Sequence, residues 1–272
     1  TGLYAASPPA VEQSMSDRLS YLRLIYRFPG LLLYVLVATP LVVIFQAKPF
    51  KAWRLGRRTV AQHAACLWCG LLCRLFGVRR RLSGRFQAGP QLVAANHISW
   101  LDIQLIYSFE PVGYVAKAEI STWPIVGWLG SLGGTVYHQR GSHDSANGVS
   151  SALHERLQAG GNVAIFPEGG ILQGTGIKLF HARMLAAAIE TGSPVQPVML
   201  RYIRDGEYYD DITFQSHEKT LDNFFRLLRQ KPCMAEVHVL PRIDSAGMQR
   251  RQLSSQAEEA VRNAYQSELP RD

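Results

Sequence analysis

The segment Leu92–Ile103 carries the pair of side chains best suited to catalysis. An apolar run ends at Asn96 and His97, and Asp102 follows in the first turn of an expected helix. Five residues apart on a regular helix, two side chains diverge by about 140°. Across the start of a helix they can meet, so that the Asp102 carboxylate orients the imidazole of His97. A histidine held in this way is a general base that takes a proton from a substrate hydroxyl.

Ser99 and Asp102 also have the spacing of a capping box, in which each side chain binds the other residue's backbone N–H at the start of a helix. This pattern predicts a helix that opens at Ser99. It leaves a second interpretation open, in which Asp102 only caps the helix and His97 is an ordinary turn residue. Because spacing alone favours this second interpretation, the catalytic one depends on other residues.

Charged residues follow three further apolar runs of strand length. Lys117 closes one run, Arg140 follows another, and Glu168 lies in the turn Phe166–Gly170 directly after a third. Ligands of open α/β sheets bind at the carboxyl ends of the strands. Each charged residue alone is typical of a surface or a turn, but together with His97 they predict one convergent polar site.

The elements that must position these residues begin after Arg81, where short apolar runs alternate with amphipathic stretches. Helices are expected over 144–159, over 179–190 with a stop at Gly192, and from about Gln249 to Leu269. This alternation predicts an α/β domain over residues 81–272. The expected strands are Gln91–Ala95, Val112–Ala116, Gly134–His138, Val163–Phe166, Val195–Leu200 and Ala235–Leu240.

Residues 28–47 form a run of 20 residues without charge, which is about the length of a helix that crosses a bilayer. Pro40 is expected to kink or interrupt that helix. Basic residues on both flanks give no positive-inside asymmetry, and they favour a segment that returns to the same side or lies in one leaflet. These flanking residues are Arg18, Arg23 and Arg27 before the run, and Lys48, Lys51, Arg54, Arg57 and Arg58 after it.

A second apolar segment, Ala61–Phe76, follows the basic stretch. Two apolar helices separated by basic residues predict a monotopic anchor over residues 16–80, held on a bilayer with anionic headgroups. In the alternative interpretation, Leu31–Phe45 is a buried core helix of a soluble protein. Residues 1–15 are small, polar and proline-containing, and we expect a disordered tail or a remnant of cloning there.

Four potential metal ligands, His63, Cys66, Cys69 and Cys73, lie at helical spacing in the second apolar segment. Thiolates and imidazoles are zinc ligands, but a Cys-x-x-Cys pair inside a continuous helix lacks the turn of most zinc knuckles. Small apolar cysteines on a packed face are the favoured interpretation, and no metal is expected.

The formal net charge of +8 is unevenly distributed. Residues 1–86 hold 13 Lys and Arg and two acids, a balance of +11, whereas the remainder has a balance of −3. The basic part lies beside apolar helices and lacks the aromatic interleaving of single-strand binders, so no nucleic-acid partner is expected. A non-catalytic lipid-binding protein remains an alternative. No G-x-S-x-G elbow and no phosphate-binding G-x-x-x-x-G-K-[ST] loop is present.

Four blocks of sequence resemble the four motifs of the glycerolipid acyltransferases, whose type member is bacterial 1-acylglycerol-3-phosphate acyltransferase. The blocks are Asn96-His97-x4-Asp102, Arg140 after a strand that starts with glycine, Phe166-Pro167-Glu168-Gly169, and Pro194-Val195-Gln196-Pro197-Val198. The resemblance covers about residues 85–245. It implies a mixed central sheet flanked by helices, and hydrophobic N-terminal helices that dock on a membrane.

The resemblance also implies roles for individual residues. His97 is expected to deprotonate the acceptor hydroxyl while Asp102 holds its tautomer. The oxygen then attacks an acyl-CoA or acyl-carrier-protein thioester directly, without an acyl-enzyme and without a further cofactor. The residues expected to bind the lysophospholipid acceptor are Asn96, Lys117, Arg140, Phe166, Pro167, Glu168, Gly169, Lys178 and Arg183.

The third motif departs from the family pattern, since Gly170-Ile171-Leu172 stands where the family usually has an arginine for phosphate. Lys178 and Arg183 are expected to compensate. The expected reaction converts 1-acylglycerol-3-phosphate to phosphatidate at the cytoplasmic face of a bacterial inner membrane. Trp100-Leu101 and the stretch FHARM resemble lyso-ornithine-lipid acyltransferases, which makes an aminolipid acceptor the alternative.

Overall fold

The computed structural model describes residues 10–122, 127, 130–131, 133–138, 143–172 and 176–268, with backbone only for 10–17, 117, 138 and 143–149. A mixed sheet with the order β3-β10-β8-β4-β7-β5-β6 forms its centre, and β9 pairs with β8. Neighbouring strands are parallel except for the antiparallel pairs β10–β8 and β8–β9. The strands are β3 (Val78–Ser83), β4 (Leu92–Ala95), β5 (Gly113–Lys117), β6 (Val136–His138), β7 (Val163–Ile165), β8 (Val195–Arg204), β9 (Glu207–Tyr208) and β10 (Cys233–Val239).

All six expected strands are present, but β3 was not anticipated. Its sequence contains three consecutive arginines, and most of its residues are exposed because β3 is an edge strand of the sheet. Charged residues are common on edge strands, since they oppose pairing with another chain. Strand β3 includes the expected domain boundary between residues 80 and 81, and the division into two domains stays a prediction.

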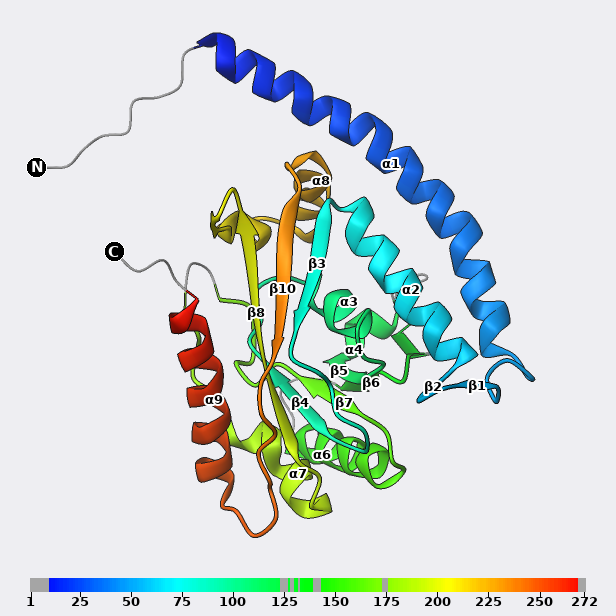
Figure 1. The fold of residues 1–272 in the computed structure, drawn as a ribbon, viewed down its shortest axis with the longest axis vertical. Helices are drawn as coiled ribbons and strands as arrows, with labels where there is room; N and C mark the ends of the chain where they lie inside the picture. The colour runs from blue at the N-terminus through cyan, green and yellow to red at the C-terminus, as the bar shows by residue number, and fades with distance from the viewer. Residues whose placement is uncertain are drawn as a thin grey trace, which may run out of the picture.

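Helices cover both faces of the sheet (Figure 1). Val93 and Ala95 of β4 belong to the core beneath α1, α2, α3 and α8, whereas Leu92 and Ala94 belong to the core beneath α6, α7 and α9. Successive side chains of a strand point to opposite faces, so this apolar run places β4 in the buried middle of three layers. The helices are α1 (Ala10–Gln46), α2 (Val60–Leu75), α3 (Asp102–Tyr107), α4 (Ala118–Ser121), α6 (His143–Gln158), α7 (Ala186–Thr191), α8 (Thr220–Arg229) and α9 (Arg250–Ser267), with 3-10 turns η1 (Ala182–Leu185) and η2 (Asp210–Ile212).

Helix α1 is longer than the sequence predicted. It contains both Pro29 and Pro40, so Pro40 does not interrupt it, and it arches along one side of the body (Figure 1). A proline removes one backbone hydrogen bond and bends a helix, which is compatible with such an arch. Residues 10–15, expected to be part of a disordered tail, are helical, while residues 1–9 lie outside the described part of the chain.

One face of α1 packs on the body and the other is exposed. Leu24, Phe28, Leu31 and Val35, at helical spacing, contact the core. The segment Arg18–Gln46 is long and apolar enough to cross a membrane, and its most apolar 18-residue window has a mean hydropathy of 2.3 and is 11% buried. A core helix of a soluble protein would be mostly buried, so that alternative is wrong for this segment.

Exposed apolar side chains continue from α1 onto the short hairpin of β1 (Arg54–Leu55) and β2 (Arg58–Thr59), and onto α2. Cys66 and Cys73 of α2 are buried while His63 is exposed, so these potential ligands do not share one environment. We call the following residues the apolar outer surface: Leu22, Ile25, Leu32, Leu33, Leu36, Val37, Leu41, Ile44, Trp53, Leu55, Leu67 and Leu71.

Two of the arginines that precede the uncharged run bind the end of α8. Arg27 is 5% exposed, and its Nη1 donates to the carbonyl oxygens of Leu228 (3.2 Å) and Gln230 (2.9 Å). Arg23 donates to the carbonyl oxygen of Arg229 at 3.3 Å. The last carbonyls of a helix lack partners within it and carry partial negative charge, which a guanidinium satisfies.

Candidate active site

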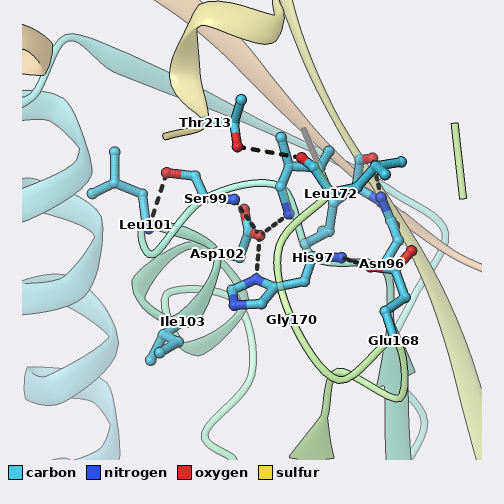
Figure 2. Close-up of polar contacts among 12 residues, drawn as sticks. Asn96, His97, Ser99, Leu101, Asp102, Ile103, Glu168, Gly170, Leu172 and Thr213 are labelled. Carbon is cyan, nitrogen blue, oxygen red and sulfur yellow. Dashed lines mark hydrogen bonds and ion pairs between the residues drawn. The ribbon is translucent and has the colours of Figure 1, made fainter. Parts of the chain in front are cut away.

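His97 and Asp102 meet at the carboxyl end of β4 (Figure 2). His97 Nδ1 lies 2.9 Å from Asp102 Oδ2, which also accepts the backbone N–H groups of Ile98 (2.7 Å) and Ser99 (2.9 Å). Asp102 is fully buried, so these donors replace the water that its charge loses. The expected contact between the two side chains is therefore present.

The expected capping box is only half formed. Asp102 accepts the N–H of Ser99, but Ser99 Oγ accepts the N–H of Leu101 at 3.4 Å rather than that of Asp102. Helix α3 accordingly begins at Asp102 and not at Ser99. The Asp102 carboxylate accepts hydrogen bonds from three residues of the preceding turn, and His97 is one of these donors.

The imidazole of His97 is fixed on a second side by an aromatic ring. Its ring stacks on Phe166 with centroids 3.9 Å apart and planes at 11°, and Phe166 in turn stacks on Tyr114 at 6.0 Å. A carboxylate accepts but does not donate, so Nδ1 carries a proton, and in the neutral imidazole Nε2 carries the lone pair. The His97 side chain is 15% exposed, and this arrangement is one that a general base requires.

Glu168 lies after β7, the strand beside β4. Its Oε2 accepts the backbone N–H of His97 (2.7 Å), and its Oε1 accepts that of Lys178 (2.8 Å). Burial raises the pKa of this carboxyl, while the two backbone hydrogen bonds oppose the rise. In this structure Glu168 joins the loops on either side of the base, and the expected contact with an acceptor headgroup stays a prediction.

Asn96 and Lys178 also bind the backbone. Asn96 Nδ2 donates to the Leu200 carbonyl oxygen (3.0 Å) and its Oδ1 accepts the Leu200 N–H (2.7 Å), which extends the pairing of β4 with β8. Lys178 Nζ donates to the carbonyl oxygens of Ile171 (2.9 Å) and Gly170 (3.5 Å). Acceptor binding by Asn96 and Lys178 stays a prediction.

The remaining expected site residues are less constrained. Pro167 is buried, Gly169 is exposed with φ of +73°, and Arg183 is exposed on η1. The backbone of Lys117 ends β5, at the sheet edge where β4 and β7 also end. Arg140 lies outside the described residues. The predicted meeting of Lys117 and Arg140 with the base therefore stays untested.

Tyr202 of β8 is a site residue that the sequence interpretation missed. Its hydroxyl donates to Asp102 Oδ1 at 2.7 Å, and its side chain is fully buried. Burial, and then the Asp102 charge, raise the pKa of Tyr202 well above its ordinary value, so it stays protonated and donates. Tyr202 lies on the same strand face as Val198 and Leu200, which are core residues beneath α3, and this alternation was the available signal.

A second set of unanticipated contacts links α8 to the site. Trp100 Nε1 donates to Asn223 Oδ1 (2.9 Å), and Asn223 Nδ2 donates to the Thr213 carbonyl oxygen (3.2 Å). Thr213 Oγ1 donates to the Leu172 carbonyl oxygen (3.3 Å), and the Leu172 N–H donates to the His97 carbonyl oxygen (3.4 Å; Figure 2). The loop that ends at Leu172 is thus held between α8 and the base.

Helix α9 supports the segment that carries Lys178. Glu258 Oε2 accepts the N–H of Phe180 (2.9 Å), and Ser254 Oγ donates to the carbonyl oxygen of the same residue (2.7 Å). Arg262 donates to the Ile177 carbonyl oxygen at 3.1 Å. The last described helix therefore fixes one of the two segments that Glu168 joins.

Within the part of the chain that the structure describes, one group of potential metal ligands lies together: Glu236, His238 and Glu268. Arg201 already pairs with two of them, with Nε 2.7 Å from Glu236 and Nη2 2.8 Å from Glu268. The positive charge of this guanidinium would repel a metal cation. The group is therefore better described as an ion-pair network that connects the end of α9 to β8 and β10.

Comparisons with known proteins identify a family for this chain. A family model described as Acyltransferase matches residues 78–201. A lyso-ornithine lipid O-acyltransferase of Pseudomonas aeruginosa is 39% identical over 197 residues, which is 72% of this chain and 76% of that protein. A 1-acyl-sn-glycerol-3-phosphate acyltransferase of Neisseria gonorrhoeae is 42% identical over 111 residues, 41% of this chain and 44% of that protein.

A solved structure has the same fold. The crystal structure of the 1-acyl-sn-glycerophosphate (LPA) acyltransferase of Thermotoga maritima superposes with a TM-score of 0.68, covers 93% of this chain and 97% of that chain, and is 20% identical in sequence. The predicted mixed α/β fold is confirmed by this likeness. Together with the sequence relatives, it places the chain in the acyltransferase family that includes the lyso-ornithine lipid and 1-acyl-sn-glycerol-3-phosphate acyltransferases.

Proposed function

We propose that this chain is a membrane-bound enzyme that transfers a fatty acyl group from an acyl-CoA or acyl-carrier-protein thioester to the hydroxyl of lyso-ornithine lipid. The chemistry rests on one observation: the buried Asp102 carboxylate lies 2.9 Å from His97 Nδ1 and leaves Nε2 as a free base. His97 has no hydroxyl or thiol nucleophile among its hydrogen-bond partners within the described residues, which favours direct transfer over an acyl-enzyme.

In the proposed step, His97 Nε2 takes the hydroxyl proton as the acceptor oxygen bonds to the thioester carbonyl carbon. The carbon–sulfur bond then breaks, and the imidazolium returns the proton to the departing thiolate. The products are an ester and a free thiol. Asp102 stabilises the imidazolium while it exists, and base catalysis of this kind contributes about 10²–10⁴-fold to the rate.

Two observations support an acceptor with an amino-acid headgroup. The relative named as a lyso-ornithine lipid acyltransferase aligns over most of the chain. The loop after Glu168 reads Gly170-Ile171-Leu172, without a cation, and the Lys178 ammonium binds the carbonyls of that loop. A phosphate would need a free cation at this place.

A second acceptor, 1-acyl-sn-glycerol-3-phosphate, is favoured by a different observation. The Neisseria relative carries that name and is 42% identical over the stretch that it shares. Arg183 is exposed on η1 and lies downstream of Glu168, where a guanidinium is available to a phosphate. Direct comparison of the two acceptors decides between them.

The apolar outer surface supports placement on a membrane. Lys48, Lys51, Arg54 and Arg57 are exposed beside it, where basic residues meet anionic headgroups. The inner face of α1 packs on α2 and α8, which favours a helix that lies in one leaflet over one that leaves the body and spans the bilayer. We place the enzyme on the cytoplasmic face of a bacterial inner membrane, where acyl thioesters are made.

The test measures thiol release and lipid products with purified protein on vesicles that contain either lyso-lipid. We expect product from lyso-ornithine lipid and loss of at least about 100-fold of the turnover in His97→Asn, since the base is removed. His217→Asn, at an exposed position, is the matched control. Undiminished turnover in His97→Asn would remove the mechanism, and turnover of the phosphate acceptor alone would remove the proposed substrate.

A further inference from the structure

We infer that Tyr202 is a positioning residue for the base: its hydroxyl holds the Asp102 carboxylate in the orientation that presents His97 Nε2 to the acceptor. This inference rests on the proposed function and adds a third member to the pair that the sequence predicted. The Tyr202 hydroxyl donates to Asp102 and not to the imidazole, so Tyr202 acts through Asp102.

The two oxygens of Asp102 have different partners. Oδ2 accepts three N–H groups, from His97 Nδ1 and from the backbones of Ile98 and Ser99. Oδ1 accepts the Tyr202 hydroxyl at 2.7 Å. A carboxylate can turn about its Cβ–Cγ bond and exchange its oxygens, and a donor on Oδ1 opposes that rotation. Without it, a buried lone pair would lose its partner.

Strand β8 gives Tyr202 a fixed position. Tyr202 is paired with Ala235 of β10 on one side, and two residues earlier Leu200 binds the Asn96 amide on the other. The same strand therefore fixes the end of β4, where the base begins, and the far side of the carboxylate. A strand with neighbours on both sides moves little, which makes it a suitable support.

Among the described side chains, Asp102 is the charged group that is hydrogen-bonded to the imidazole. Burial raises the pKa of the Cys73 thiol of α2 to about 12 and that of the Tyr114 hydroxyl of β5 well above its ordinary value, so both are neutral. Glu168, which follows β7, binds the backbone N–H of His97 and not its ring. The Tyr202 hydrogen bond thus weakens the attraction between the Asp102 carboxylate and the His97 ring.

The variant Tyr202→Phe keeps the packing and removes the donor. We expect kcat to fall by roughly 10- to 100-fold, which corresponds to the loss of one hydrogen bond to a buried charge, while KM for both substrates changes by less than about twofold. We also expect the acidic limb of the kcat profile to move to higher pH, because a carboxylate without its second donor stabilises the imidazolium more strongly.

The matched control is Tyr209→Phe. Tyr209 is 6% exposed and stacks beneath Arg204, with the guanidinium carbon 3.5 Å from its ring centroid, and it makes no contact with Asp102 in the structure. This variant should keep the wild-type pH profile. A Tyr202→Phe enzyme with the wild-type kcat and pH profile would overturn the inference, whatever its thermal stability.

A substrate-free measurement separates this inference from the proposed function. The ¹⁵N and N–H proton resonances of His97, assigned by their absence in His97→Asn, report the hydrogen bond to Asp102 in either variant. We expect them to shift in Tyr202→Phe and to stay in place in Tyr209→Phe. Unchanged resonances overturn the role of Tyr202 even in an active enzyme, whereas an inactive wild type with shifted resonances would sink only the acyl-transfer proposal.

Discussion

At the scale of single residues, the site contains two kinds of contact. Some join residues that are close in the sequence, and others form only because the sheet brings distant segments together. The contact between His97 and Asp102 was predictable, because two side chains five residues apart can meet across the start of a helix. The contact of Glu168 with His97 and that of Tyr202 with Asp102 were not, because 71 and 100 residues separate the partners. Such contacts depend on strand order and register, which a single sequence does not specify.

Glu168 provides a test at this scale. In Glu168→Gln one oxygen becomes an amide nitrogen, which cannot accept, so one buried backbone N–H at His97 or Lys178 loses its partner. We expect the free energy of unfolding to fall by about 1–3 kcal/mol, and kcat to fall with it, as measured by denaturant titration and by the acyl-transfer assay. The control Glu155→Gln, at an exposed position of α6, should change neither.

Glu168 makes the free energy of unfolding depend on pH, and the sign of this dependence is defined. Burial raises the pKa of Glu168, so the folded protein binds this proton at a pH where the unfolded chain has released it. The contribution of this carboxyl to the free energy of unfolding is therefore fully present below its ordinary pKa and is lost as pH rises through the folded value. The glutamine variant should lack this component, and a parallel pH dependence in both proteins would contradict the assignment.

At the scale of elements, the sequence predicted the strands with apolar composition and missed those with polar composition. Strand β3 was not predicted because its three arginines interrupt the apolar pattern of a strand. Helix α8 was not predicted because ten residues give only a short periodic signal. Both elements matter for the site. Helix α8 supplies Asn223, which binds Trp100, and its end is held by Arg27 of α1.

Arg27→Met tests this link, since methionine keeps the packing but removes the guanidinium. The carbonyl oxygens of Leu228 and Gln230 lose their donor, and we expect a loss of about 1–3 kcal/mol in the free energy of unfolding. Amide hydrogen exchange in 213–229 should accelerate. Arg23→Met, which removes a single 3.3 Å bond, should have a smaller effect, and equal effects of the two would argue against a specific role for Arg27.

At the scale of the whole molecule, the charge distribution and the apolar outer surface lie in the same part of the chain. The apolar helix in this part was predicted from the sequence, because an uncharged run of 20 residues is a strong signal. It could not specify which face of α1 contacts the body, since nearly every position in the run is apolar. The packing of α1 against α2 and α8 determines which face is buried.

A double variant, Leu36→Asp with Val37→Asp, tests the membrane role. These side chains are 72% and 53% exposed, so the fold should tolerate the change. Each removes about 1.5–3 kcal/mol of apolar transfer, and we expect vesicle binding to fall by at least about 100-fold in co-sedimentation. Turnover of detergent-dispersed substrates should persist. Ser151→Asp on α6 is the control, and unaltered vesicle binding in the double variant would place the membrane contact elsewhere.

The support of the Lys178 segment by α9 has a consequence for synthesis on the ribosome. Of the described helices, α1 emerges first and α9 last, some 240 residues later. The growing chain thus offers its apolar helix to the bilayer long before Ser254, Glu258 and Arg262 can secure residues 177–180. Under the proposed function, delivery to the membrane would therefore precede completion of the site, and the nascent enzyme would reach its lipid before it could acylate it.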